Sequence, residues 1–160
     1  DTDIGGYVRA DTGDNILAGS LGARGEVEQA ADPDDFDRNL SPQILEPLYR
    51  LAQRIPSLGI PNSLSGVADL WDVSDDWIPI YDCTDVPGFY IAIGTSGNQF
   101  KTAPAVGEMM AALISACEQG ADHDQDPVHF QLARTSYELN LGFFSRNRDP
   151  NPASSLSVLG

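Results

Sequence analysis

A strand pattern that leads through a glycine-bearing turn directly into a helix is the feature that most constrains this fold. Residues 89–93 are five consecutive apolar residues, a run typical of a buried strand. Gly94 and Gly97 follow, and glycine lets a backbone approach a flat ring closely. A helix is predicted next, because apolar side chains recur at helical spacing at Val106, Met109, Met110, Leu113, Ile114 and Cys117. We expect the N–H groups at this helix entrance to favour a negatively charged group.

Other short strands and one further helix complete a mixed α/β (α+β) pattern. Residues 7–9 and 16–21 flank a cluster of turn residues, which predicts a hairpin. Ser41 and Pro42 begin a helical pattern that runs to Ile55. Residues 64–73 have an extended pattern, and a domain boundary is expected near residue 60.

The charge balance limits the partners of the chain. Twenty-four acidic side chains stand against nine basic ones, the net charge is −15, and Lys101 is the only lysine. Such a surface repels phosphate backbones and anionic lipids, so we expect no nucleic-acid or membrane partner. No run approaches the roughly 20 apolar residues of a membrane helix, and we expect a cytoplasmic protein without a membrane span.

The remaining cysteines and charged residues are expected to have structural or surface roles. Cys83 and Cys117 lack metal-site spacing and are expected to be reduced, partly buried thiols. No metal site is predicted, because the only candidate cluster lies in an acidic segment interpreted as a solvated loop: Asp122, His123, Asp124, Asp126 and His129. A hydrated acidic surface is the interpretation for Asp75, Asp76 and Asp82. Arg146 and Arg148 in the tail are weak candidates for contacting a partner chain.

Residues 66–115 resemble the C-terminal signature of the D-amino-acid oxidase superfamily, in its sarcosine and glycine oxidase branch. The resemblance is carried by residues 72–80 (DVSDDWIPI), 86–97 (VPGFYIAIGTSG), 100–101 (FK) and 103–107 (APAVG). It is looser over residues 5–60 and absent after 135. The chain is expected to be the C-terminal half of a two-domain FAD-binding fold, of the glutathione-reductase kind, with an antiparallel substrate-domain sheet.

The resemblance also assigns parts of the chain to that fold. Residues 1–60 correspond to part of the substrate domain, residues 61–135 to the C-terminal part of the FAD-binding domain, and residues 136–160 to a tail or partner-contacting segment. The activity implied is oxidation of a C–N bond in an amino acid or secondary amine, with hydride transfer to flavin N5 and hydrolysis of the imine.

Site residues are carried over position by position. Lys101 matches the lysine that contacts the substrate carboxylate, which makes it the catalytic and substrate-binding candidate. The flavin-side loop is matched by Gly94, Thr95, Ser96, Gly97, Asn98, Gln99 and Phe100. Arg9 and Trp71 are further substrate-binding candidates, with a surface salt bridge and simple packing as the respective alternatives.

Three positions depart from the family pattern. Asn98 and Gln99 replace the usual His-Gly, which makes the loop bulkier. Asp69 stands about where some relatives carry a flavin-linked cysteine, so noncovalent FAD is expected. Leu17 stands about where sarcosine oxidases have an oxygen-activating lysine, which leaves a dehydrogenase with another acceptor open.

The GxGxxG dinucleotide-binding fingerprint of the family is absent from the sequence. We therefore expect a second chain or an N-terminal segment to supply that unit, and the small-molecule substrate to be an amine or amino acid. The alternative is a noncatalytic binding or structural module that keeps the fold without the cofactor.

Overall fold

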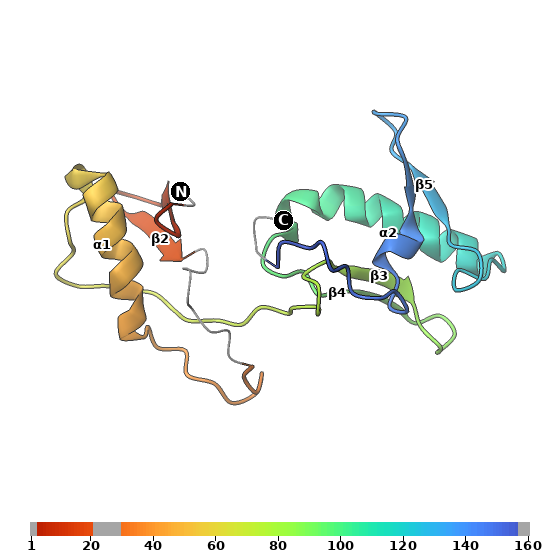
Figure 1. Ribbon diagram of the computed structural model, residues 1–160, viewed down its shortest axis with the longest axis horizontal. Coiled ribbons are helices and arrows are strands. Elements are labelled where there is room, and N and C mark those ends of the chain that lie inside the picture. Colours follow the sequence, from red (N-terminus) through yellow and green to blue (C-terminus); the bar gives the residue numbers. More distant parts are fainter. Residues whose placement is uncertain (1–2, 21–29, 157–160) are drawn as a thin grey trace. The chain divides into compact units, whose positions relative to one another are not determined.

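A computed structural model describes residues 3–20 and 30–156 (Figure 1). The chain divides into two compact units, Asp1–Leu70 and Trp71–Gly160. The domain boundary expected near residue 60 lies inside the first unit. Leu21, at the end of the second predicted strand, and residues 157–160 of the predicted tail lie outside the described residues.

The first unit contains the predicted hairpin and helix. Strands β1 (Gly6–Ala10) and β2 (Ile16–Ser20) pair antiparallel, with Val8 opposite Ala18. A 3₁₀ turn, Pro42–Ile44, leads into α1 (Leu45–Arg54), and a second 3₁₀ turn follows at Pro56–Leu58. Leu51 of α1 is buried and packs close to the Cα of Gly6. The β1–β2 hairpin and α1 therefore pack together, with Leu51 as the buried apolar residue between them.

The predicted extended segment, residues 64–73, forms no strand. Its backbone is held by isolated hydrogen bonds, including Ala68 N–H to the Arg38 carbonyl at 3.0 Å. A strand requires a continuous ladder with a neighbour, and no described strand pairs with this segment.

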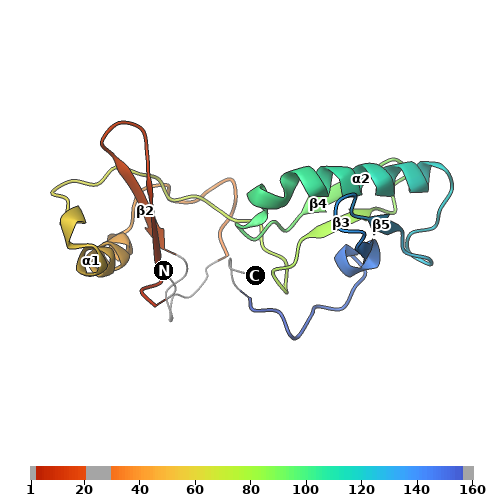
Figure 2. The ribbon, with the colours of Figure 1, turned by 90° about the horizontal axis from the view of Figure 1, so that it is seen from above.

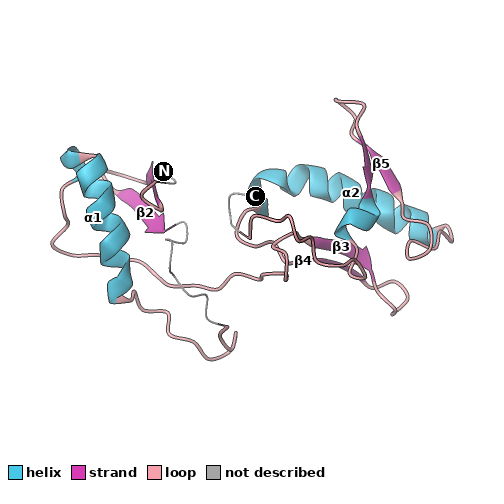
Figure 3. Ribbon diagram, in the orientation of Figure 1, coloured by secondary structure: helices cyan, strands magenta, loops and turns pink. Residues whose placement is uncertain are grey.

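The second unit is built around helix α2 (Ala103–Glu118). Strands β3 (Ile80–Cys83) and β4 (Tyr90–Ile93) form an antiparallel pair, and α2 lies along it in two perpendicular views (Figures 1 and 2). Strands β5 (His129–Gln131) and β6 (Glu138–Asn140) form a further hairpin (Figure 3). The core combines Tyr81, Met109, Leu113 and Leu141.

Strand β4 differs from the prediction of a fully buried strand. Ala92 and Ile93 are exposed, and Tyr90 and Ile91 are only half-buried. The apolar run does form a strand, but its only described partner is β3, and α2 supplies the helical cover. The described helices include none that is both long and apolar enough to cross a bilayer.

Two carboxylates assigned to the hydrated surface are in fact buried. Asp76 is 2% exposed and Asp82 is fully buried, whereas Asp75 is exposed as expected. Arg148 Nη2 lies 2.7 Å from Asp76 Oδ1, and Arg146 Nη1 lies 3.2 Å from Asp82 Oδ2. Both arginines therefore bind carboxylates of their own unit, and residues 145–151 pack onto the β3 region. Buried ionised groups require such partners.

Asp76 collects hydrogen bonds from several segments. Besides Arg148, the N–H groups of Ile78 and Asn151 donate to it at 3.1 and 3.0 Å. Burial opposes the charged form, but these hydrogen bonds and the guanidinium outweigh it and lower the pKa of Asp76 from 3.8 to about 2. Because the folded-state pKa is the lower one, this stabilisation is present above about pH 4 and is lost as the pH falls toward 2.

Replacement of Asp76 by Asn is expected to lower the free energy of unfolding by about 3 kcal/mol, because Arg148 keeps its charge without a carboxylate. Urea denaturation at neutral pH measures the effect. Asp75→Asn removes the same charge from an exposed position and should change stability by less than about 0.5 kcal/mol. The gap between wild type and Asp76→Asn should shrink between pH 4 and pH 2. Equal losses in the two variants would contradict a buried ion pair.

Candidate functional site

The segment that joins β4 to α2 turns sharply through backbone conformations that favour glycine. Gly94 and Gly97 have φ angles of +68° and +74°, and Ser96 between them has +49°. A Cβ atom on Gly97 would lie 2.9 Å from Trp71 Cε2, so this glycine also makes room for the indole. A 3₁₀ turn, Gln99–Thr102, then continues directly into α2. Residues 94–102 are called the β4–α2 loop below.

Asp72 holds the first half of the β4–α2 loop. Its Oδ2 accepts the N–H groups of Gly94 and Thr95 at 2.7 and 3.1 Å, and its Oδ1 accepts the Thr95 hydroxyl at 2.5 Å. The Asp72 carbonyl accepts the Ser96 N–H at 2.9 Å. Partial burial opposes ionisation, but the hydrogen bonds from Thr95 and Gly94 outweigh it and lower the pKa of Asp72. The carboxylate and the carbonyl of Asp72 together thus set the path of three successive residues.

Sequence analysis did not identify Asp72 as a site residue. It lies 22 positions before Gly94, and nothing in local spacing links an aspartate to a loop that distant. Asx residues often accept backbone N–H groups, but normally those of near neighbours in the chain. Only the folded backbone shows which loop this carboxylate holds.

The two residues that replace His-Gly are tied to the core. Gln99 Oε1 accepts the hydroxyls of Tyr81 at 3.2 Å and Thr102 at 2.7 Å. The Gln99 amide also donates to Asn98 Oδ1. Tyr81 is buried, so the second half of the loop is anchored on the hydrophobic core.

The outer side of the β4–α2 loop combines aromatic and cationic groups. Phe100 is 98% exposed, Trp71 is 52% exposed, and Lys101 is exposed as well. Within the described part of the chain, no carboxylate forms an ion pair with Lys101. Trp71 also packs edge-on against Trp77, with ring centroids 6.3 Å apart. The loop candidates, Lys101 and Trp71 therefore all lie in the second unit, with Trp71 beside Gly97.

Arg9 belongs to the first unit. It is exposed on β1 and lies opposite Leu17 of β2 in the strand register. Arg9 and Leu17 are therefore neighbours on the hairpin, which pairs a substrate-binding candidate with the position expected to bear on oxygen reactivity.

The loop meets part of what a flavin ring needs. The N–H groups of Gly94, Thr95 and Ser96 are already bonded to Asp72, so they are not the free anion-facing donors expected from the sequence. The Gly97 N–H donates to no other described residue, and the exposed Phe100 and Lys101 follow it. Residues 97–101 thus offer a flavin one N–H donor, an aromatic ring and a cation, while the sequence provides no pyrophosphate-binding fingerprint.

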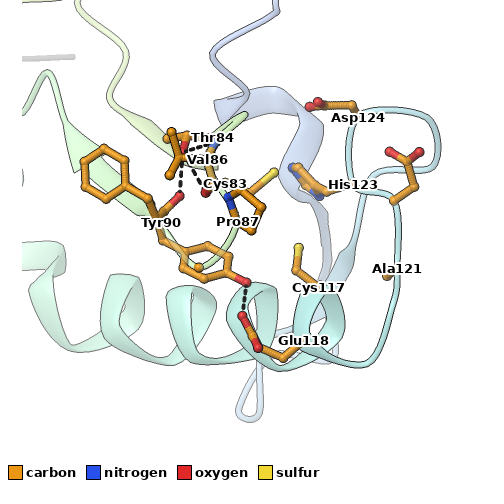
Figure 4. Close-up of a pocket in the computed structure, with 13 residues that line it drawn as sticks. Cys83, Thr84, Val86, Pro87, Tyr90, Cys117, Glu118, Ala121, His123 and Asp124 are labelled. Carbon is orange, nitrogen blue, oxygen red and sulfur yellow. Dashed lines mark hydrogen bonds between the residues drawn. The ribbon is translucent and has the colours of Figure 1, made fainter.

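A second polar region surrounds an open pocket of about 680 Å³ (Figure 4). Its lining includes Cys83, Tyr90, Cys117, His123 and Asp124. The Tyr90 hydroxyl donates to Glu118 at 2.8 Å, and this hydrogen bond raises the pKa of Tyr90 to about 12.

The prediction of a solvated loop is wrong for His123, which is 2% exposed, although Asp122, Asp124 and Asp126 are exposed. His123 Nδ1 accepts the Val128 N–H at 3.0 Å, which leaves the proton of a neutral ring on Nε2. Nε2 lies 3.7 Å from Asp82 Oδ1, beyond hydrogen-bonding distance, and has no other described partner. Asp82 itself accepts from the Ser145 hydroxyl and the Arg146 N–H at 3.0 and 2.7 Å.

Ligand-type atoms of Asp82, Cys83 and Asp124 lie within 4.8 Å of one another, as a metal site would require. Arg146 Nη1 stands among them, 3.2 Å from Asp82 Oδ2, 2.8 Å from Asp124 Oδ1 and 3.8 Å from Cys83 Sγ. The hydrogen bonds from Arg146 lower the pKa of Asp124 despite partial burial, and those to Asp124 raise the pKa of Arg146. A guanidinium therefore supplies the positive charge at this cluster.

Asp72→Asn is expected to loosen the first half of the β4–α2 loop, because an amide cannot accept all the hydrogen bonds of the carboxylate. Hydrogen bonds to a charged acceptor contribute about 1.5–3 kcal/mol each, so the amides of Gly94 and Thr95 should exchange with deuterium at least about tenfold faster. Asp75→Asn is the charge-matched control and should leave these rates unchanged. Unaltered exchange in Asp72→Asn would show that the loop keeps its path without this carboxylate.

Comparison with known proteins gives one match. The family model DAO, described as FAD dependent oxidoreductase, matches residues 1–113, which is more than half of the chain. No curated protein and no solved structure matches significantly. The matched region contains both hairpins β1–β2 and β3–β4, the whole β4–α2 loop and most of α2.

Proposed function

Since the chain belongs to the family of FAD-dependent oxidoreductases, we propose that it takes part in oxidation of the C–N bond of an amino acid or secondary amine. The observation that carries the choice of substrate is Lys101. This cation is exposed and makes no ion pair with a described residue, and it lies in the β4–α2 loop next to the exposed Phe100. A free cation beside a flavin-facing loop suits a substrate that carries a carboxylate.

The β4–α2 loop has two roles in this proposal. Residues 97–100 would hold the flavin ring system, with the Gly97 N–H, which has no acceptor among the described residues, as a donor and Phe100 as an apolar contact. Asp72 is a positioning residue. It does not itself contact the flavin in this proposal, but it binds the backbone of Gly94 and Thr95, which precede the contact residues. Asp69 stands about where some relatives carry the flavin-linked cysteine, so the FAD is noncovalent.

The chemistry that bound FAD supplies is acceptance of a hydride from the carbon next to the amine nitrogen. The Lys101 ammonium binds the substrate carboxylate and so orients that carbon. Trp71 encloses the amine side of the substrate. The imine product is then hydrolysed by water. The sarcosine and glycine oxidase branch is the proposed subtype, with small or secondary amino acids as substrates.

A second component is also part of the proposal. The 160 residues contain no GxGxxG motif to hold a pyrophosphate. We infer that another chain, or a segment outside these residues, binds the ADP half of FAD. Leu17 stands about where sarcosine oxidases have the oxygen-activating lysine. The proposal therefore includes electron acceptors other than oxygen.

A noncatalytic module is the second candidate, and one observation favours it. Contacts within the second unit already explain two features of the loop. Trp71 packs against Gly97, which requires a glycine there, and Asp72 accepts the N–H groups of the three residues that precede Gly97. A structural role alone would explain this loop, but it leaves Lys101 and Phe100 exposed without a function.

The visible spectrum of the protein, isolated with all associated components, tests whether the assembly holds flavin. We expect two flavin bands that bleach when an amine substrate is added without oxygen. Acid precipitation should release the flavin into the supernatant, because the cofactor is noncovalent. An assembly without flavin bands would contradict the proposal and favour the noncatalytic module.

Lys101→Met in the assembled enzyme tests the carboxylate contact. We expect kcat/KM for the amino-acid substrate to fall about 100-fold, in line with about 3 kcal/mol for a hydrogen-bonded charge. Lys101→Arg should retain part of the activity. The decisive control is the matching amine without a carboxylate, which wild type and Lys101→Met should oxidise equally. Equal loss with both substrates would show that Lys101 acts otherwise.

A further inference from the structure

The two cysteines of the chain end two packed elements. Cys83 is the last residue of β3, and Cys117 lies in the last turn of α2. Both are free and half-buried, and both line the open pocket (Figure 4). A small solute in that pocket therefore reaches both thiols.

The two thiols also interact electrostatically, since each influences the pKa of the other. In Figure 4 the Cys117 side chain rises from α2 toward the end of β3, where Cys83 lies. The elements that carry them pack together in the core of the second unit. A bond between the sulfurs would therefore join two elements that already pack together.

We propose that Cys83 and Cys117 are a modification site for peroxides, at which oxidation joins β3 to α2 through a reversible disulfide. In the first step a thiolate attacks a peroxide oxygen and the O–O bond breaks. With hydrogen peroxide the products are a sulfenic acid and one water. In the second step the other sulfur attacks, the S–S bond forms, the S–O bond breaks and a second water leaves. Two thiols are oxidised and one peroxide is reduced to two waters.

The surroundings of the pair make this reaction slow at neutral pH. Burial and the hydrogen bond to Asp82 raise the pKa of Cys83 to about 11, and burial also raises the pKa of Cys117. Asp82, Asp124 and Glu118 face the two sulfurs with negative charge, while Arg146 Nη1 lies 3.8 Å from Cys83 Sγ. Since the thiolate is the attacking form, the pair responds to sustained peroxide rather than to brief exposure.

The cross-link would enclose the site described above. Cys83 and Cys117 flank β4, the β4–α2 loop and nearly all of α2. Closing this segment into a covalent loop reduces the freedom of the unfolded chain and stabilises the fold. The inference rests on the two thiols alone and holds whether or not the proposed oxidation of amines is correct.

The experiment treats the reduced, full chain with hydrogen peroxide at pH 9 and then counts thiols and measures mass. We expect two titratable thiols before treatment and none after it, a mass lower by two hydrogen atoms, and a linked peptide containing Cys83 and Cys117. Dithiothreitol should restore both thiols. The melting temperature of the oxidised form should be several degrees higher than that of the reduced form.

The single variants Cys83→Ser and Cys117→Ser are the matched controls. Each should gain oxygen atoms at its remaining thiol and show no rise in melting temperature. Three outcomes overturn the proposal: oxygen addition without cross-linking in the wild type, covalent dimers in place of the internal link, or thiols that react only after a chelator removes a metal ion. The wild-type measurements decide the matter even if a variant fails to fold.

Discussion

The buried pairing of Asp82 with Arg146 is the interaction on which the second unit depends most. Asp82 is fully buried, so its charge must be compensated inside the protein. Arg146 does this from more than sixty residues further along the chain, and it also binds Asp85 and Asp124. The end of β3, the loop after α2 and the C-terminal segment are thereby held together. The apolar core around Leu113 is small, which makes these polar contacts more important for defining the fold.

A second buried carboxylate repeats the arrangement at the other end of β3. Asp76 binds Arg148 and the N–H groups of Ile78 and Asn151. The two pairs bracket β3 and attach the C-terminal segment on both sides. Removing one partner of such a pair is costly because the other keeps an uncompensated charge. The acidic composition of the chain therefore has two parts, a solvated majority and a few carboxylates with structural roles.

The β4–α2 loop lies in the same unit, but residues other than the two buried ion pairs hold it in place. Asp72 shapes the first half of the β4–α2 loop, and Gln99 ties the second half to Tyr81. Among the described residues, the Gly97 N–H has no acceptor, Lys101 has no ion-pair partner and Phe100 is exposed. The proposed function assigns these outer groups to the flavin and its substrate. Membership of the FAD-dependent oxidoreductase family agrees with this arrangement.

Local pattern was enough to predict the hairpin at residues 6–20, the two long helices, the strand at 90–93 and the free cysteines, since each follows from periodicity, turn residues or spacing. The resemblance also led to the family.

Burial of charged groups could not be predicted in this way. Asp75 and Asp76 are adjacent and identical, yet one is exposed and the other is 2% exposed. Their difference arises because only Asp76 meets Arg148, 72 residues away. Asp72 and His123 likewise acquire their places from distant backbone and side chains. The sequence by itself determined these elements, because they follow from near neighbours, and its resemblance to known proteins determined the family. Tertiary structure alone decided which of many similar acidic side chains lose their water, because that depends on partners which only folding brings together.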